Sequence, residues 1–327
     1  MRPVWAEVDL GAISANVATL RAVAAPAAMC AVVKADGYGH GAVPAARAAL
    51  AGGADVLAVA LVAEGVELRE AGIDTVVMVL SQASADEIDT LVEADLDATV
   101  YTASGVRGLA DAAGRAGRTA ERPVRVHLKV DTGMHRVGVQ PDEAVELARA
   151  IAAEPALDLR SVFTHCAVAD EPGNPFTGEQ LARFDAVLAD LAAADIAVPC
   201  THAANTAATL DHPEARRGLV RCGIGIYGLD PAPALAGRVP LRPALSLHAR
   251  VSHVKRVAAG EGISYGLRYR PTQETTIATV PLGYADGLPR RLGGTPQGPA
   301  HLLRGRQRRH AVLRPARKGQ VERRAPG

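Results

Sequence analysis

The sequence predicts an α/β fold, a parallel (β/α)8 TIM-like barrel followed by a C-terminal all-β domain. Short apolar runs alternate with longer stretches rich in Ala, Leu, Glu and Arg, as strands and helices alternate in a barrel. Polar residues stand at the ends of several apolar runs. From about Pro240 strand-like segments follow one another without helices between them, which indicates a second, all-β domain.

Eight apolar runs are the candidate barrel strands. They are Met29–Val33, Asp55–Ala60, Val76–Ser81, Asp97–Tyr101, Val124–Val130, Leu159–His165, Val198–Ala203 and Leu219–Cys222. Helical patterns between them include Val62–Ala71, Ala85–Ala94, Asp142–Ala153 and Gly178–Ala193. An open doubly wound sheet is the alternative. The barrel is favoured because polar residues stand at the ends of different strands around the whole set.

The second domain is predicted to contain three strand segments, Ala244–Val257, Gly262–Tyr269 and Thr275–Leu282. We therefore expect a barrel over residues 1–238, a partial β-domain over 239–292 and a separate tail over 293–327.

Composition bounds the class of protein. Hydrophobic residues make up 48% of the 327 residues and aromatic residues 3%, so the core is expected to be large and aliphatic. The N-terminal MRPVWAEVDL lacks the apolar region of a signal peptide, which predicts a cytoplasmic protein without a membrane segment. The four cysteines form no CxxC pair, so reduced thiols are expected rather than a metal site.

The net charge of +1 hides an uneven distribution. Residues 304–327 hold nine of the 36 Lys and Arg residues and one of the 35 Asp and Glu residues. The remainder of the chain is therefore mildly acidic, which argues against a nucleic-acid-binding main domain.

The sharpest motif is AVVKADGYGHG, Ala31 to Gly41. Lys34 directly follows an apolar strand and precedes a loop with three glycines, which would let the backbone approach a ligand. Desolvation disfavours a charged amine and so favours its nucleophilic form. The alternative is an ordinary strand-end lysine whose amine reaches solvent.

Further polar residues follow later strands. His165 ends the sixth strand, and the loops after strands seven and eight, where barrels commonly bind phosphate, contain the next group. That group comprises His202, Asn205, Thr206, Arg221, Gly223 and Ile224.

From about Ala6 to Leu292 the chain resembles the alanine racemases, which carry pyridoxal 5′-phosphate (PLP). The resemblance rests on AVVKADGYGHG, HLKVDTGMHRVG, FTHCAVAD, THAANTAAT, VRCGIGIYG, EGISYGLRY and VPLGYADG. It implies that Lys34 carries the cofactor and that Tyr38 touches its phosphate. The resemblance implies that six further residues bind the cofactor: His165, Asn205, Thr206, Arg221, Gly223 and Ile224.

The resemblance also implies roles around the substrate. Arg136 would hold the substrate carboxylate, as suits a planar fork of donors. Lys129 matches a lysine that is carbamylated in some members of the family, and an ordinary ion pair is the equal alternative. Arg221 would face the pyridine nitrogen and, by keeping its own proton, leave that nitrogen unprotonated.

Inversion of an α-carbon needs one base on each face. The resemblance assigns these bases to Lys34 and to Tyr265, the latter supplied by the second subunit of a homodimer. A chain Arg221–His165–Tyr265 would favour the phenolate. Tyr284 is assigned to substrate binding, and Asp286 lies in the same motif.

After about Leu292 the sequence departs from the family pattern. The tail is rich in Arg, Pro, Gly and Ala and has no periodicity, so it is expected to be disordered and to add no strands. A basic binding arm and a lost reading frame are the two interpretations, and the second is favoured. An incomplete β-domain would weaken dimerisation and activity.

The sequence thus predicts a homodimeric, PLP-dependent racemase of L- and D-alanine that supplies peptidoglycan synthesis. A PLP-binding regulatory barrel, a decarboxylase of the same superfamily and a catalytically compromised racemase remain as alternatives. The choice between alanine and serine stays open.

Overall fold

The computed structural model describes residues 3–287 and the backbone of 310–313. The chain divides into two compact units, Asp9–Ala244 and a second unit made of Met1–Val8 and Leu245–Gly327. This division differs from the expected one in two ways. The N-terminal strand belongs to the β-unit, and the junction lies at Ala244 rather than at residue 238.

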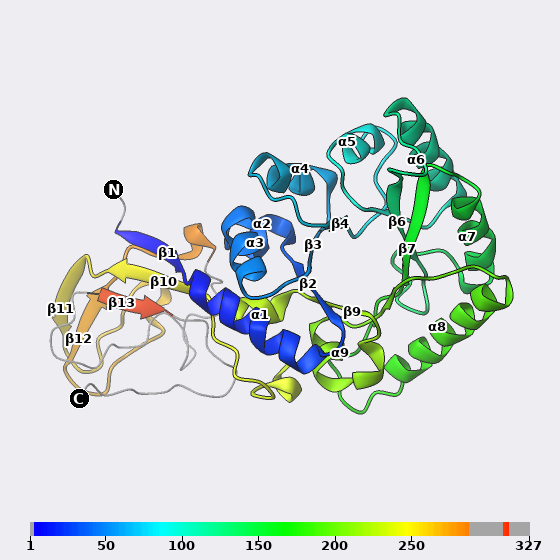
Figure 1. The fold of residues 1–327 in the computed structure, drawn as a ribbon. Coiled ribbons are helices and arrows are strands. Elements are labelled where there is room, and N and C mark those ends of the chain that lie inside the picture. Colours follow the sequence, from blue (N-terminus) through cyan, green and yellow to red (C-terminus); the bar gives the residue numbers. More distant parts are fainter. Residues whose placement is uncertain (1–2, 288–309, 314–327) are drawn as a thin grey trace. The chain divides into compact units, whose positions relative to one another are not determined.

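The first unit is a parallel barrel, as expected (Figure 1). Its eight strands are β2 (Ala28–Val32), β3 (Val56–Val59), β4 (Val77–Val79), β5 (Ala98–Val100), β6 (Val124–Lys129), β7 (Leu157–Phe163), β8 (Thr201–His202) and β9 (Leu219–Cys222). They pair in parallel as β4-β3-β2-β9 and β5-β6-β7-β8.

Backbone hydrogen bonds join these two sheets at both seams. The amide of Val79 donates to the carbonyl of Asp97 at 3.0 Å, which links β4 to the start of β5. At the other seam the amide of Arg221 donates to the carbonyl of Ala204 at 2.9 Å. The strands therefore close on themselves, which excludes the open doubly wound sheet.

Helices lie around the outside of the strands (Figure 1). They are α1 (Leu10–Ala24), α3 (Ala42–Ala51), α4 (Val62–Glu70), α5 (Ile88–Glu93), α6 (Ala103–Arg115), α7 (Ala144–Ala152), α8 (Phe176–Ala193) and α9 (Thr206–Asp211). The short segment labelled α2 (Lys34–Gly39) has a left-handed backbone and follows β2 directly. In α6 the Thr102 hydroxyl caps the first turn, and Val106, Leu109 and Ala113 recur on one buried face. This spacing is the pattern of an amphipathic helix.

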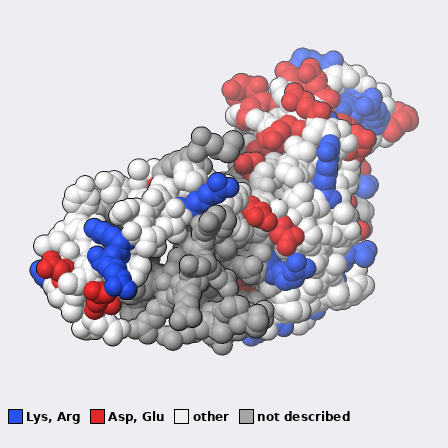
Figure 2. Space-filling model, turned by 90° about the vertical axis from the view of Figure 1, so that its left-hand side faces the viewer, with Lys and Arg blue, Asp and Glu red and all other residues white. Residues whose placement is uncertain are grey.

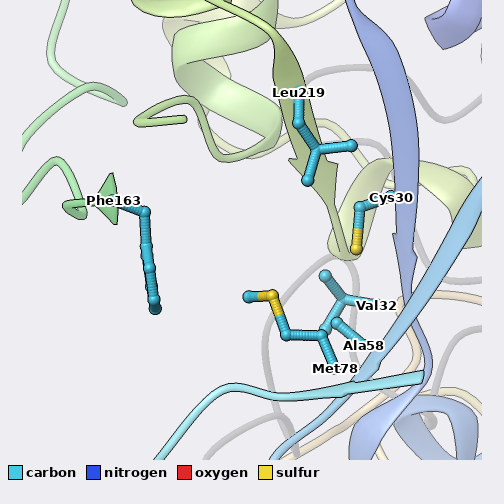
Figure 3. Packing of buried hydrophobic residues seen from close by; sticks show 6 residues of the cluster. All are labelled: Cys30, Val32, Ala58, Met78, Phe163 and Leu219. Carbon is cyan, nitrogen blue, oxygen red and sulfur yellow. The ribbon is translucent and has the colours of Figure 1, made fainter. Parts of the chain in front are cut away.

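A cluster of buried hydrophobic side chains fills part of the barrel interior. Cys30 and Val32 of β2, Ala58 of β3, Met78 of β4 and Leu219 of β9 form one buried cluster together with Phe163 of β7. Figure 3 shows the Phe163 ring facing this cluster from the opposite side of the barrel. The Phe163 ring thus packs with smaller side chains from four other strands of the barrel.

The second unit contains two small antiparallel sheets. One has the order β1-β10-β13, built from β1 (Val4–Val8), β10 (Leu245–Arg250) and β13 (His310–Leu313). The other pairs β11 (His253–Val257) with β12 (Thr275–Thr279). The predicted strand over 244–257 is thus two strands in different sheets.

Two further expectations for this unit are wrong. Gly262–Tyr269 is a loop around the 3₁₀ turn η5 (Tyr265–Leu267), because Ser264, Gly266 and Leu267 all have positive φ. Strand β13 pairs with β10, so the segment after Leu292 does add a strand. The rest of the tail, residues 293–309 and 314–327, lies outside the described residues. The disorder expected for these residues therefore stays a prediction.

Among residues 3–287 and 310–313, no helix combines the length and the apolar character needed to cross a membrane. On the face drawn in Figure 2, acidic and basic side chains of the described residues are mixed with one another.

Candidate active site

Lys34 begins an unusual turn at the end of β2. From Ala35 to Tyr38 the backbone winds left-handed, with φ between 52° and 58° and ψ between 35° and 56°. Three of these four residues are not glycine, and each costs about 1–2 kcal/mol in this conformation. Gly39 and Gly41 of the same motif also have positive φ, so this turn uses the conformational freedom of its glycines.

Side-chain and backbone hydrogen bonds hold this turn. Glu64 of α4 accepts from the amide of Ala35 at 2.6 Å, and the Asp36 carboxylate accepts from the amide of Ala42 at 2.8 Å. The amide of Gly41 donates to the Asp36 carbonyl at 2.9 Å. These bonds offset the strain and fix Lys34 and Tyr38 at the barrel mouth.

A cavity of about 550 Å³ opens at the carboxyl ends of the barrel strands. Every predicted site residue of the barrel unit lines it except His202. They are Lys34, Tyr38, Lys129, Arg136, His165, Asn205, Thr206, Arg221, Gly223 and Ile224. Four of these side chains are cationic, and among the lining residues that the structure describes Asp170 is the one carboxylate. The cavity therefore suits an anionic ligand.

Arg221 is buried on the floor of the cavity. Its Nη2 donates to the carbonyl oxygens of Thr164 and Ala203, at 2.8 and 3.1 Å, and its Nη1 lies 2.5 Å from His202 Nδ1. Burial lowers the pKa of Arg221 to about 10. The guanidinium thus keeps its charge at neutral pH, although it has been removed from water.

His165 lies beside Arg221, as predicted. Its Nδ1 is 3.2 Å from Arg221 Nη2, and because an arginine only donates, Nδ1 accepts. Burial, and then the positive charge of Arg221, hold the pKa of His165 well below its usual value. The ring is therefore neutral at neutral pH, and the positive charge of this pair stays on Arg221.

Lys129 and Arg136 stand on another side of the cavity. Lys129 ends β6 and is buried, whereas Arg136 is exposed on the following loop. Burial, and then the charges of Arg221 and Arg136, lower the pKa of Lys129 to about 8. The Lys129 amine lies 5.6 Å from the centre of the Phe163 ring, and Arg221 lies over the same ring at 5.2 Å.

Hydroxyl and backbone groups gather where Tyr38, Thr206 and Gly223 meet. The Thr206 hydroxyl accepts from the amide of Gly223 at 3.1 Å. A Cβ atom added to Gly223 would lie only 2.5 Å from the Tyr38 hydroxyl oxygen. Glycine at this position is what allows the Tyr38 hydroxyl to approach the loop after β9.

The two predicted site tyrosines of the β-unit lie on its surface. The Tyr265 side chain is 89% exposed at the tip of its loop, and Tyr284, 66% exposed, begins the 3₁₀ turn η6 (Tyr284–Asp286). Asp286 accepts from the amide of Gly283 at 2.9 Å, which shapes that turn. Within its own unit, neither tyrosine side chain is held in a buried setting.

Several cavity residues escaped sequence reasoning. Ala60 and Leu80 directly follow β3 and β4, so the rule that barrel sites lie at strand ends could have found them. Phe163 and Asp170 belong to a motif from which only His165 was singled out. His202 is the converse case, because it is fully buried beneath the cavity and contacts Arg221 rather than the open space.

Known protein families match both units of the chain. Residues 8–231 match the family model of the alanine racemase N-terminal domain, and residues 244–312 match that of the C-terminal domain. The second match continues past Leu292, where the family pattern was expected to stop. Alanine racemase of Symbiobacterium thermophilum is 48% identical over 307 residues, which cover 94% of this chain and 80% of that protein.

Solved structures agree. Alanine racemase from Streptomyces lavendulae is 42% identical and has a TM-score of 0.82, with 90% of this chain and 77% of that chain covered. Alanine racemase from Bacillus anthracis, solved with bound L-Ala-P, is 38% identical and has a TM-score of 0.78. The match covers 90% of this chain and 76% of the Bacillus anthracis chain.

Proposed function

The chain belongs to the alanine racemase family of isomerases, and from this premise we propose that it interconverts L- and D-alanine with PLP bound in the barrel cavity. The observation that carries the proposal is the cation-rich cavity at the strand ends, where Lys34, Lys129, Arg136 and Arg221 converge. Such a cavity matches a ligand that bears a phosphate and a substrate that bears a carboxylate.

The donor set of the cavity fits PLP. The Lys34 amine can hold its aldehyde carbon, and the Tyr38 and Thr206 hydroxyls and the glycine loop after β9 offer donors to its phosphate. The close approach of Tyr38 to Gly223 leaves no room for a side chain there, as expected of a tight phosphate cradle. Asn205, His165 and Ile224 complete the cofactor contacts in this proposal.

When bound, PLP withdraws electrons from the α-carbon and so makes its proton removable. The protein tunes that withdrawal through Arg221, which we assign to the pyridine nitrogen. Because Arg221 retains its proton, that nitrogen stays unprotonated and the electron withdrawal is moderate. With the cofactor bound, this weaker electron withdrawal would leave less opportunity for side reactions such as transamination.

Two bases on opposite faces are proposed to exchange the α-proton. Lys34 serves one face from within the barrel, and Tyr265 serves the other. We propose that this Tyr265 belongs to a second copy of the chain. Because the Tyr265 loop is exposed, its side chain can reach the site of the other subunit in a homodimer. Tyr284 of the same unit would contact the substrate.

Arg136 is proposed to bind the substrate carboxylate, positioned by Lys129. With a pKa of about 8, Lys129 has a sizeable free-amine fraction at mildly alkaline pH. The free amine can add to carbon dioxide, forming a C–N bond and releasing one proton, and the resulting carbamate would pair with Arg136. Native mass spectrometry of the intact protein should show the added mass of one carbon dioxide, which should be absent in Lys129→Met.

The test of the whole proposal is direct. Purified protein with added PLP should be yellow, and borohydride should fix a pyridoxyl group on the peptide that contains Lys34. It should also convert L-alanine to D-alanine faster than L-serine to D-serine. Label on the Lys129 peptide, or cofactor binding without turnover, would favour a different assignment or a regulatory barrel. We further propose a cytoplasmic location and a supply of D-alanine to peptidoglycan.

A further inference from the structure

A continuous chain of buried polar side chains runs inside the barrel, with one residue on each of four neighbouring strands and one directly before a fifth. Its members, here called the polar relay, are Arg221 on β9, His202 on β8, Ser161 on β7, His127 on β6 and Asp97 before β5. All five residues are buried, and the most exposed of them, His127, is 7% exposed. Of the five, only Arg221 lines the cavity, so the other four members act on the cavity through it.

Short contacts join each member to the next. His202 Nδ1 lies 2.5 Å from Arg221 Nη1, and His202 Nε2 lies 2.8 Å from the Ser161 hydroxyl oxygen. That oxygen lies 2.6 Å from His127 Nδ1, and His127 Nε2 lies 3.1 Å from Asp97 Oδ2. Both nitrogens of each histidine are therefore engaged.

The chemistry of the two ends gives the relay a direction. Arg221 can only donate and an ionised Asp97 can only accept. His202 Nδ1 must then accept, so its proton sits on Nε2 and points to Ser161. The Ser161 hydroxyl in turn donates to His127 Nδ1, and the His127 proton on Nε2 points to Asp97.

Asp97 is itself fixed from the other side. Its Oδ1 accepts from Arg125 Nε at 2.5 Å, and Arg125 Nη2 also reaches the carbonyl oxygen of Asp95 at 3.2 Å. Both carboxylate oxygens of Asp97 thus face donors. A group placed between two donors must offer two acceptors, which a carboxylate does and an amide does not.

We propose that Asp97, His127 and Ser161 are positioning residues that set the tautomer of His202 and thereby hold the charged guanidinium of Arg221 at the cavity floor. The consequence for racemisation rests on the function proposed above. The tautomers themselves do not, because they follow from the hydrogen bonds inside the barrel.

Asp97→Asn is the sharpest test because it reverses the relay. Arg125 must still face an oxygen, so the new amide nitrogen turns toward His127. His127 then has to accept at Nε2 and carry its proton on Nδ1. The Ser161 hydroxyl becomes a donor to His202, and the His202 proton moves to Nδ1, where it opposes Arg221, itself a donor.

The measurement is the set of ring ¹⁵N chemical shifts of His127 and His202 in the full-length protein with PLP. The signals are assigned with His127→Gln and His202→Gln. The wild type should show both rings neutral with the proton on Nε2. Asp97→Asn should show both with the proton on Nδ1. In Asp97→Asn/Ser161→Ala, the matched control, the reversal should reach His127 and stop there.

Activity supplies a second readout. Two opposed donors beneath the cavity should lower kcat for alanine about 10- to 100-fold in Asp97→Asn, with KM changed less than about twofold. Asp97→Glu, which restores two acceptors, should recover part of kcat. An inactive wild type would refute the proposed function while leaving the tautomer result intact.

Three results would overturn the relay. They are a wild-type His127 protonated on both nitrogens, a His202 tautomer unchanged in folded Asp97→Asn, and an equal reversal at His202 when Ser161 is alanine. Should Asp97→Asn not fold, Ser161→Ala alone decides. The ¹⁵N signals of both histidines must then move, because both rings bond the same oxygen, and movement of only one would contradict the relay.

Discussion

The barrel cavity and the Tyr265 loop are held in opposite ways. Arg221 is 3% exposed and bonded on both terminal nitrogens, whereas Tyr265 is 89% exposed at the tip of a turn. Parallel strands fix the first group, since side chains at their ends are anchored by the sheet. A surface loop fixes the second group only weakly. Under the roles proposed above, one chain would hold the cofactor by itself, whereas Tyr265 would need a second copy of the chain to be placed as the second base.

The largest effect should come from the barrel side of this contrast. Lys34→Ala should abolish covalent attachment of PLP and lower racemisation by at least about 10⁴-fold, because the variant loses both the attachment point and one base. Absorbance and borohydride labelling would report attachment. Lys255→Ala, on an exposed strand of the β-unit, is the control and should leave both unchanged. Full activity of Lys34→Ala would refute the assignment.

Tyr265→Phe tests the loop side. Removing only the hydroxyl should leave PLP bound and lower racemisation in both directions by about 10²- to 10⁴-fold, as for other positioned acids or bases. Polarimetry from each enantiomer measures this. Tyr269→Phe, in the same loop, should retain near-normal rates. An unchanged rate in Tyr265→Phe would exclude Tyr265 as a base, and the Tyr265 loop would then have no proposed catalytic role beside the barrel cavity.

Gly223→Ala probes how tightly the barrel side is built. The added methyl group would lie 2.5 Å from the Tyr38 hydroxyl oxygen, so PLP affinity should fall about 10- to 100-fold. Equilibrium titration measures the change. In Gly223→Ala/Tyr38→Phe the clashing oxygen is absent, so the methyl group should cost less than in the single variant. If Gly223→Ala binds PLP normally, the proposed phosphate cradle is misplaced.

The smallest effect concerns Lys129. Its folded-state pKa of about 8 lies below the unfolded value of about 10.4, so the unfolded chain binds more protons between these values. Burial of the charged amine costs stability at pH values below 8, and this cost is relieved as the pH rises through 8. Without carbon dioxide, stability should gain about 1 kcal/mol from this group between pH 7 and pH 9.

Denaturant unfolding at both pH values, in the wild type and in Lys129→Met, isolates this contribution. The variant should lack the Lys129 share of the pH slope. Identical slopes in the two proteins would show that burial of the charged Lys129 amine does not lower the stability of the fold.

The sequence predicted the barrel better than the β-unit for a physical reason. Buried parallel strands are continuous apolar runs, so runs such as the one ending at Val33 are visible without further context. In the β-unit, Gly262–Tyr269 alternates like a strand. The positive φ of Ser264, Gly266 and Leu267 makes it a loop instead.

The cavity residues were predictable where a motif or a strand end marked them. The polar relay was not, since Ser161 and His127 lie inside their strands and carry no local signal. Only the register that sets His127 beside Ser161 brings these side chains together. The left-handed turn after Lys34 was hidden too, because Ala35 and Tyr38 are not residues that favour positive φ.

Mixing two inactive variants tests most directly whether the second base comes from another copy. Lys34→Ala and Tyr265→Phe are purified, dissociated together and reassociated. A mixed dimer then has one site that combines an intact Lys34 with a Tyr265 from the other chain. Random pairing should restore about one quarter of the wild-type activity. Activity no higher than the sum of the two separate variants would contradict the account, because Tyr265 would then serve its own chain.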